Sequence, residues 1–195
     1  AGTAVSYPAR FRLILSMTPC PCGNFGTPDR ACVCPPDAVE RYWKRLAAPL
    51  LDRIDLRVRA GIPGSAEMAN GGGPNGTADG ADTAAMRRRI AGARRRQHAR
   101  NRESRDAYAR GENPGWLNAH LDPERTERIC ALGKDERAAY SEIVEAGRLS
   151  GRGAHGILKV ARTIADLDDS ERITKEHLSE AWGFRRREDG APGIL

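Results

Sequence analysis

The sequence predicts a mixed α/β to mainly α fold, in which a short α/β part precedes a helical domain. Three observations support this fold class. Two apolar segments of strand length lie near the start of the chain, a glycine-rich stretch follows them, and helical patterns fill the remainder. The three parts are expected at residues 1–60, 61–82 and 83–195.

The two predicted strands differ in pattern. Residues 11–17 read FRLILSM, a short apolar run that ends at Thr18-Pro19, where the proline removes a backbone donor. Residues 54–58 read IDLRV and alternate apolar with charged side chains, which is typical of a half-buried strand. A helix capped by Asp37 is expected between them, because apolar side chains follow Asp37 at helical spacing.

Residues 61–82 contain almost no apolar side chains, so they cannot bury enough surface to offset their ordering entropy. We therefore expect a flexible linker there. The pattern is helical from Thr83, where a long basic helix should run to about Arg110. Further helices are expected from Asp122-Pro123, over residues 134–147, over residues 155–167, and after Thr174 with His177 in its first turn.

Composition narrows the setting in which the chain works. The net charge is +6 and the pI about 9.4, which suits contact with polyanions but says nothing about fold. No apolar run is long enough to span a membrane, and residues 1–4 do not resemble a signal peptide. A cytoplasmic, reducing location is expected, and the five cysteines are interpreted accordingly.

Four of these cysteines form two C-x-C pairs separated by nine residues: Cys20, Cys22, Cys32 and Cys34. Four thiolates gathered by a short loop can bind zinc tetrahedrally, and the metal would then stabilise a loop that has no apolar core. The alternative is a loop of reduced cysteines held in place by prolines. A redox role has less support because the usual C-x-x-C spacing is absent. Cys130 is expected to be an ordinary buried thiol.

Two arginines have modest meanings when taken alone. Arg53 lies between an apolar turn and a predicted strand, where a surface salt bridge is the simplest interpretation. Arg162 is four residues from Asp166 on a predicted helix, a spacing typical of an intrahelical ion pair.

Three segments, taken together, resemble one family. They read TPCPCG at residues 18–23, PLLDRIDL at 49–56 and VARTIADL at 160–167. Their order and spacing are similar to those in the C-terminal half of the magnesium-chelatase-like AAA+ proteins linked to competence, the ComM/YifB family. The resemblance implies the end of an AAA+ (P-loop NTPase) α/β core followed by a helical lid.

The resemblance also implies roles for single residues. Thr18 occupies the sensor 1 position, where the family usually has an asparagine that orients the attacking water. Arg53 resembles the arginine finger that reaches a neighbouring subunit's nucleotide, and Arg162 resembles sensor 2, which contacts the γ-phosphate of ATP. A guanidinium suits both positions because it is permanently charged and planar.

The cofactors that the resemblance implies are ATP and Mg²⁺. The spacing of the four cysteines separately predicts zinc. The chain contains no G-x-x-x-x-G-K-[ST] phosphate loop (Walker A) and no apolar strand ending in Asp-Glu (Walker B). We therefore expect the isolated chain not to hydrolyse ATP. The parent protein would be a homo-oligomer, a hexameric ring by family analogy, that acts on DNA and has no membrane contact.

The arginine-rich helix has two interpretations. Arg94, Arg95 and Arg96 could contact DNA phosphates, which suits a branch-migration or helicase function. Alternatively, the helix is solvated and pairs with acidic partners on neighbouring subunits. No aromatic side chains interleave with these arginines, so base stacking has no support.

Two further functions remain open from the sequence. The first is a chelatase-type subunit that drives metal insertion into a tetrapyrrole. The second is a zinc-stabilised basic DNA-binding module with no link to ATP hydrolysis. The cysteine loop and the motif set favour the DNA-remodelling ATPase over the chelatase-type subunit, and ATP turnover with and without DNA would separate all three functions.

Overall fold

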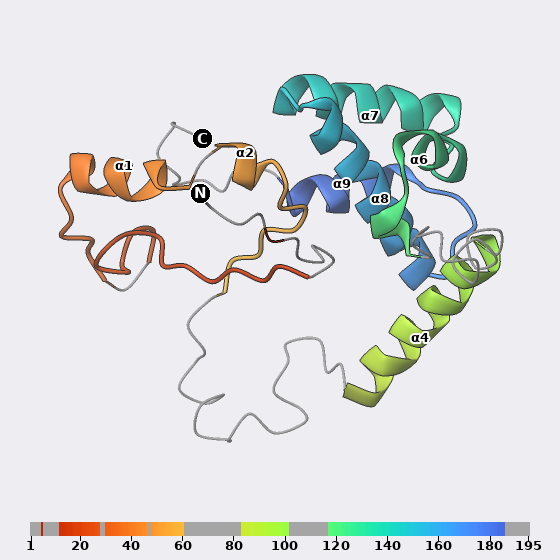
Figure 1. Ribbon diagram of the computed structural model, residues 1–195, viewed down its shortest axis with the longest axis horizontal. Coiled ribbons are helices and arrows are strands. Elements are labelled where there is room, and N and C mark those ends of the chain that lie inside the picture. The colour runs from red at the N-terminus through yellow and green to blue at the C-terminus, as the bar shows by residue number, and fades with distance from the viewer. Residues whose placement is uncertain are drawn as a thin grey trace. The chain divides into compact units, whose positions relative to one another are not determined.

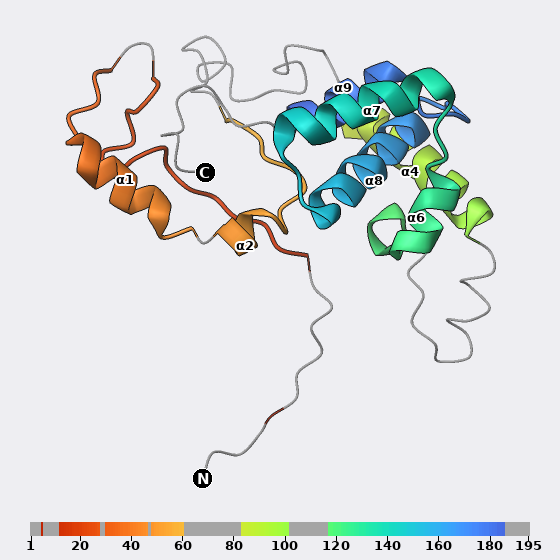
Figure 2. The same ribbon diagram turned by 90° about the horizontal axis from the view of Figure 1, so that it is seen from above.

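The computed structural model describes residues 5, 12–27, 30–46, 48–60, 83–101 and 117–185 (Figures 1 and 2). Its regular structure over these residues is helical, without strands. The chain divides into two compact units, one of Ala1–Ala47 with Arg187–Leu195 and one of Ala48–Arg186. Residues 48–60 therefore group with the helical part of the chain. The predicted linker at 61–82 and the predicted helical residues 102–110 lie outside the described ranges.

The first unit is organised around helix α1, Pro36–Lys44. Pro35 occupies the N-cap position, so Asp37 lies within the first turn and is not the cap that was expected; Pro36 suits the first helical position because it needs no hydrogen-bond partner there. Two side chains of α1 hold the preceding loop. The Trp43 indole Nε1 donates to the Pro19 carbonyl at 3.0 Å, and the Tyr42 hydroxyl lies 3.1 Å from the Thr18 hydroxyl.

The two strand predictions are wrong for the described residues. Residues 12–18 and 54–60 form no strand. A β-strand needs a neighbour that takes up its backbone groups, and the described ranges offer neither segment a second strand. The apolar side chains of the first segment consequently face solvent, with Ile14 83% exposed and Leu13 and Leu15 each 52% exposed.

The second unit contains the remaining helices. They are α2 (Ala48–Leu51), α4 (Thr83–Arg100), the 3-10 helix η1 (Asn118–His120), α6 (Pro123–Ile129), α7 (Lys134–Gly147), α8 (Gly151–Leu167) and α9 (Lys175–Gly183). Helix α8 is central: α9, α4, η1 and α6 all pack against it, and α7 packs against α9 (Figure 2). None of the described helices is long and apolar enough to cross a membrane.

The core of this unit lies on one face of α8. Ile157, Leu158, Ala161, Ile164 and Ala165 recur at helical spacing on that face and are buried. They pack against Cys130 and against three side chains from α9 and the segment before it: Ile173, Leu178 and Ala181. Ala161 and Ala165 have small side chains, which lets neighbouring helices approach closely. The amphipathic helix predicted over residues 155–167 is confirmed.

Side-chain caps explain where these helices start. Asp122 accepts a hydrogen bond from the Arg125 amide at the start of α6, as its position before Pro123 predicted. Ser150 accepts from the Gly153 amide at 3.0 Å, so α8 begins four residues earlier than its apolar pattern indicated. At α9 the backbone amide of Thr174 donates to His177 Nδ1 at 3.0 Å, completing a capping box. The helix predicted at 134–147 is confirmed as α7.

Candidate functional site

The four cysteines of the C-x-C pairs come together in the first unit. We call Cys20, Cys22, Cys32 and Cys34 the thiol cluster; their sulfur atoms all lie within 4.8 Å of one another. Gly23 makes this possible, because its φ of +81° turns the chain directly after Cys22. The Gly23 amide donates to the Cys20 carbonyl at 3.0 Å and closes that turn.

The sulfur separations fit the demands of a zinc ion. A tetrahedral site with Zn–S bonds of about 2.3 Å has sulfur atoms about 3.8 Å apart. Sγ of Cys20 lies 3.4 Å from that of Cys22 and 3.6 Å from that of Cys32, and the Cys22 and Cys32 sulfurs are 3.7 Å apart. The Phe25 amide also lies 3.4 Å from Cys20 Sγ, where it can donate to a metal-bound thiolate. The donor set therefore suits zinc.

The local backbone perturbs the thiols unequally. Hydrogen bonds from the backbone of Asn24 and of Val33 stabilise the Cys22 thiolate and lower its pKa to about 6. The backbone of Cys22 acts in the same direction on Cys34, but burial and the neighbouring thiols outweigh it and raise the pKa of Cys34 to about 12. Cys130, in the other unit, is buried among apolar side chains, and this burial raises its pKa to about 11.

Thr18, the expected sensor 1 residue, lies beside the thiol cluster. Its hydroxyl donates to the Cys20 carbonyl at 3.0 Å, and it also lies within hydrogen-bond distance of the Tyr42 hydroxyl. The side chain thus links the start of the cysteine loop to α1.

Arg53, the expected arginine finger, is exposed on the second unit. It follows the short helix α2, and its Nη1 donates to the Pro49 carbonyl at 2.6 Å. The Arg53 amide donates to the Leu50 carbonyl at 3.0 Å, which forms a tight turn at this point. We call residues 50–58 the DRID segment. Its exposed guanidinium is available to a group outside this chain.

Sequence reasoning missed Arg185, which fastens the DRID segment to the helical unit. Arg185 follows α9 and is 5% exposed. Its Nη2 donates to the Asp52 carbonyl at 2.7 Å and to the Asp52 carboxylate at 2.8 Å, and its Nη1 lies 3.3 Å from Asp55 Oδ1. The signal in the sequence was the pair of acidic residues around Arg53, which require cationic partners.

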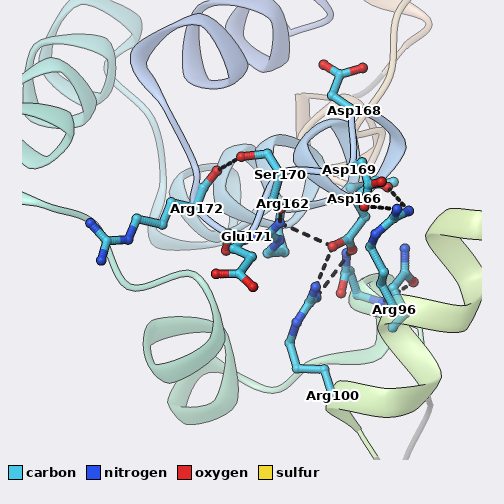
Figure 3. A network of polar contacts seen from close by, with 12 residues as sticks. Arg96, Arg100, Arg162, Asp166, Asp168, Asp169, Ser170, Glu171 and Arg172 are labelled. Carbon is cyan, nitrogen blue, oxygen red and sulfur yellow. Dashed lines mark hydrogen bonds and ion pairs between the residues drawn. The ribbon is translucent and has the colours of Figure 1, made fainter.

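Arg162, the expected sensor 2 residue, is 2% exposed. Its guanidinium donates to the backbone carbonyls of Glu171 at 2.8 Å and Ser170 at 2.6 Å, and its Nη2 lies 3.2 Å from Asp166 Oδ1 (Figure 3). These contacts tie the end of α8 to the turn that leads to α9. The spacing-based interpretation of an ion pair with Asp166 therefore describes this geometry.

Asp166 is the centre of a buried polar network (Figure 3). Its side chain is fully buried and receives hydrogen bonds from Arg100 of α4 and from Asn118 Nδ2, the latter at 2.9 Å. The backbone amide of Asn118 donates to Gln97 Oε1 at 3.1 Å. The network thereby joins α4, η1 and α8 through one carboxylate.

The arginines of α4 divide between two faces. Arg96 faces α8, where it pairs with Asp169 and donates to the Asp166 carbonyl at 2.9 Å. Arg94 and Arg95 are exposed. Two members of the expected triplet of nucleic-acid contacts are thus exposed, and the third, Arg96, is bound to Asp166 and Asp169.

The sequence patterns also did not single out Arg152, which is exposed in the first turn of α8. It lies two residues from Ser150, whose hydroxyl donates to the Asp52 carboxylate at 2.8 Å. This places Arg152 at the end of α8 that contacts the DRID segment. The sequence signal was its position in the first helical turn, two residues after the Ser150 cap.

Two family models match the chain. Residues 80–185 match the model described as magnesium chelatase, subunit ChlI C-terminal, and residues 1–67 match the model described as magnesium chelatase, subunit ChlI. Together these matches extend over most of both units.

Curated relatives match along nearly the whole chain. The uncharacterized protein YifB of Escherichia coli (strain K12) is 36% identical over 184 residues, which is 93% of this chain. The competence protein ComM of Haemophilus influenzae is 33% identical over 186 residues, or 95% of this chain. The chain spans about a third (32%) of the length of each of these relatives.

Proposed function

The chain belongs to the magnesium-chelatase-like family that includes YifB and ComM, and we propose that it forms the lid and the end of the core of a ring-forming AAA+ ATPase. In this proposal ATP hydrolysis drives DNA remodelling such as branch migration. The relationship to a competence protein favours DNA over a tetrapyrrole as the substrate.

The observation that carries this proposal is the exposed Arg53 on an anchored segment. Phosphoryl transfer spreads charge over several oxygens, and a fixed guanidinium supplied by a neighbouring subunit stabilises that charge. Arg53 satisfies two requirements for this role. Its guanidinium faces outward, and the segment around it is held by Arg185 and Ser150, so the group is preorganised.

The exposed apolar segment at residues 12–17 supports an ATPase core completed by additional polypeptide. Leu13, Ile14 and Leu15 are consecutive, so they project to both faces of an extended chain, and all three are exposed. Continuous apolar runs are typical of strands buried on both faces of a parallel sheet. We propose that this segment joins such a sheet. We also propose that Mg²⁺ and ATP are bound by a part of the full-length protein that corresponds to the portion of the relatives that this chain does not span.

The lid's contact with the γ-phosphate has two candidates on α8. Arg162 was assigned to it by motif, yet its guanidinium is buried and already bound to carbonyls and to Asp166. Arg152 is exposed at the other end of α8, two residues after Ser150, which bonds Asp52 of the DRID segment. We propose Arg152 as the phosphate contact and Arg162 as a residue that stabilises the lid. An Arg152→Ala ATPase with unchanged nucleotide affinity would return the role to Arg162.

Zinc is part of the proposal because the thiol cluster has the donor set and separations that the ion requires. The metal would supply cross-linking of the cysteine loop and no reaction chemistry. Protein purified without chelator should contain about one zinc per chain, and Cys22→Ser should lose it. A metal-free protein with the same thiol environment would contradict the assignment.

The test of the central proposal is ATP turnover by the proposed full-length ATPase carrying Arg53→Ala. Loss of an arginine finger should lower turnover about 10³-fold or more and leave nucleotide binding nearly intact. Arg128→Ala is the matched control, because Arg128 is also exposed but lies on α6. Unimpaired turnover in Arg53→Ala would refute the finger.

Mixed rings sharpen this test. Arg53→Ala subunits should regain activity when combined with subunits that cannot bind nucleotide but keep their own Arg53, because the two defects then lie on opposite sides of one interface. Stimulation of turnover by branched or single-stranded DNA would separate the DNA function from a tetrapyrrole chelatase. A zinc-bound, DNA-binding protein without any ATP turnover would instead support the non-ATPase module.

A further inference from the structure

Arg185 binds the backbone on both sides of Arg53. Its Nη2 donates to the Asp52 carbonyl at 2.7 Å, and its Nη1 lies 3.4 Å from the Ile54 carbonyl. These carbonyls belong to the residues directly before and after Arg53. The carboxylates of Asp52 and Asp55 neutralise the buried guanidinium at 2.8 and 3.3 Å. Arg185 therefore fixes the path of the chain through Arg53 and does not only pair with a surface charge.

Two glycines of α8 make room for this arrangement. A Cβ placed on Gly153 would lie 3.0 Å from Arg185 Nη2, and one placed on Gly156 would lie 2.6 Å from Asp55 Oδ1 and 3.2 Å from Arg185 Nη1. Both positions are in the interior of a helix, where glycine is less favourable than alanine. The close approach of the DRID segment explains why small residues stand there.

Other bonds connect the same segment to the helical unit. The Ser150 hydroxyl, which caps α8, donates to the Asp52 carboxylate, and the Arg57 amide donates to the Phe184 carbonyl at 2.8 Å. Phe184 directly precedes Arg185. The segment is thus attached to the start of α8 and to the end of α9, and a displacement of these helices would carry the segment with it.

We propose that Arg185 is a positioning residue that couples the helical lid to Arg53, so that movement of the lid within one subunit moves the arginine offered to the next subunit. The catalytic part of this inference rests on the proposed function of Arg53. Its structural part, the attachment of residues 52–57 to α8 and α9, does not.

The sharpest perturbation is Gly156→Ala. The added methyl group would lie 2.6 Å from Asp55 Oδ1 and 3.2 Å from Arg185 Nη1, so the Asp55 carboxylate must shift and its pairing with Arg185 is disturbed, while alanine favours the helical state of α8. Gly151→Ala is the matched control, because a Cβ at Gly151 on the same helix meets nothing within 4 Å. Arg185→Lys is the second variant, since lysine keeps the charge but cannot bridge two carbonyls with a planar fork.

Hydrogen exchange of the 195-residue chain reports on the attachment. In Gly156→Ala and Arg185→Lys, exchange at the Arg57 amide should rise about tenfold, comparable to the loss of one charge-assisted hydrogen bond. Exchange in the core of α8, at Ile164 and Ala165, should stay unchanged or become slower in Gly156→Ala. Gly151→Ala should leave the Arg57 amide as it is. Unchanged exchange at Arg57 in both test variants would overturn the proposal.

Turnover in the full-length ATPase completes the test. Gly156→Ala should lower kcat for ATP at least about tenfold and leave KM nearly unchanged, because the finger acts on the transition state. Faster hydrogen exchange at the Arg57 amide combined with a normal kcat in Gly156→Ala would overturn the coupling to Arg53. If Arg53→Ala also retained full turnover, the finger assignment itself would be refuted, and the exchange result would still establish the attachment.

Discussion

Replacing Asp166 with asparagine removes the charge at the centre of the buried network with little change of shape. The Asp166 side chain is fully buried and lies beside the Arg162 guanidinium, which is itself 2% exposed. Burial already lowers the pKa of Arg162, and the Asp166 carboxylate opposes that shift. In the variant, Arg162 would remain buried and charged without its anionic partner, and the new amide would direct hydrogens toward Arg100 or Asn118.

The magnitude follows from these contacts. Removing one partner of a buried ion pair costs about 3–5 kcal/mol. The lower end applies, because Arg162 keeps its bonds to the carbonyls of Ser170 and Glu171, and the Arg100 side chain is 26% exposed and can turn to solvent. We therefore expect Asp166→Asn to lower the free energy of unfolding by about 3 kcal/mol. At about 4 °C per kcal/mol, the melting temperature should fall by roughly 10 °C.

Urea unfolding followed by far-ultraviolet circular dichroism measures this loss, with unchanged m values as the sign that the same unit unfolds. Asp169→Asn is the control, because Asp169 is only three residues away and pairs with Arg96 but has a side chain 79% exposed. It should cost less than about 1 kcal/mol, as exposed ion pairs do. Equal, small losses in both variants would refute the idea that Asp166 compensates a buried cation.

Three further predictions concern other parts of the chain. In metal-free protein, the alkylation rate of Cys22 should rise through pH 6, because its lowered pKa makes the thiolate dominant above that value. Cys130, with a pKa of about 11, should stay unreactive at neutral pH. Equal alkylation rates of the two cysteines, measured by mass spectrometry, would contradict this. Ile157→Ala should destabilise the helical unit by about 2–5 kcal/mol in urea unfolding, because Ile157 is 1% exposed in its core, and a loss below about 1 kcal/mol would contradict that packing. If the proposed full-length ATPase binds DNA through α4, reversing the charge of Arg94 and Arg95 should weaken that binding. The slope of the logarithm of the binding constant against the logarithm of the salt concentration should then fall in magnitude by about two, and an unchanged slope would exclude phosphate contacts there.

The helices could be predicted from the sequence because their signals are local. The pattern of α8, the Asp122 cap and the Thr174–His177 pair each lie within a few residues, and each is confirmed. The strand predictions failed at residues 12–18 because a strand depends on a partner far away in sequence. The apolar pattern indicates a segment that is buried in a sheet, and the described residues contain no second strand that could cover it.

The polar contacts also divide into local ones, which the sequence predicted, and long-range ones, which it did not. The spacing of Arg162 and Asp166 indicated a pair, but the burial of that pair depends on α4 and η1, which approach from distant parts of the chain. Arg185 was invisible for the same reason, because its partner Asp52 precedes it by 133 residues. The cysteine spacing predicted a four-sulfur group, and the structure brings those sulfurs within 4.8 Å of one another.

The exposed segment at residues 12–17 also bears on protein quality control. A run of apolar side chains without proline, left uncovered, is the kind of sequence that initiates β-aggregation and that chaperones and proteases recognise. Arg12 and Pro19 stand at its two ends, where a charge and a missing backbone donor discourage pairing with further chains. In the proposed ATPase this segment must be covered promptly during synthesis, so subunits that fail to complete the proposed sheet would be removed before they could join and disable the proposed ring.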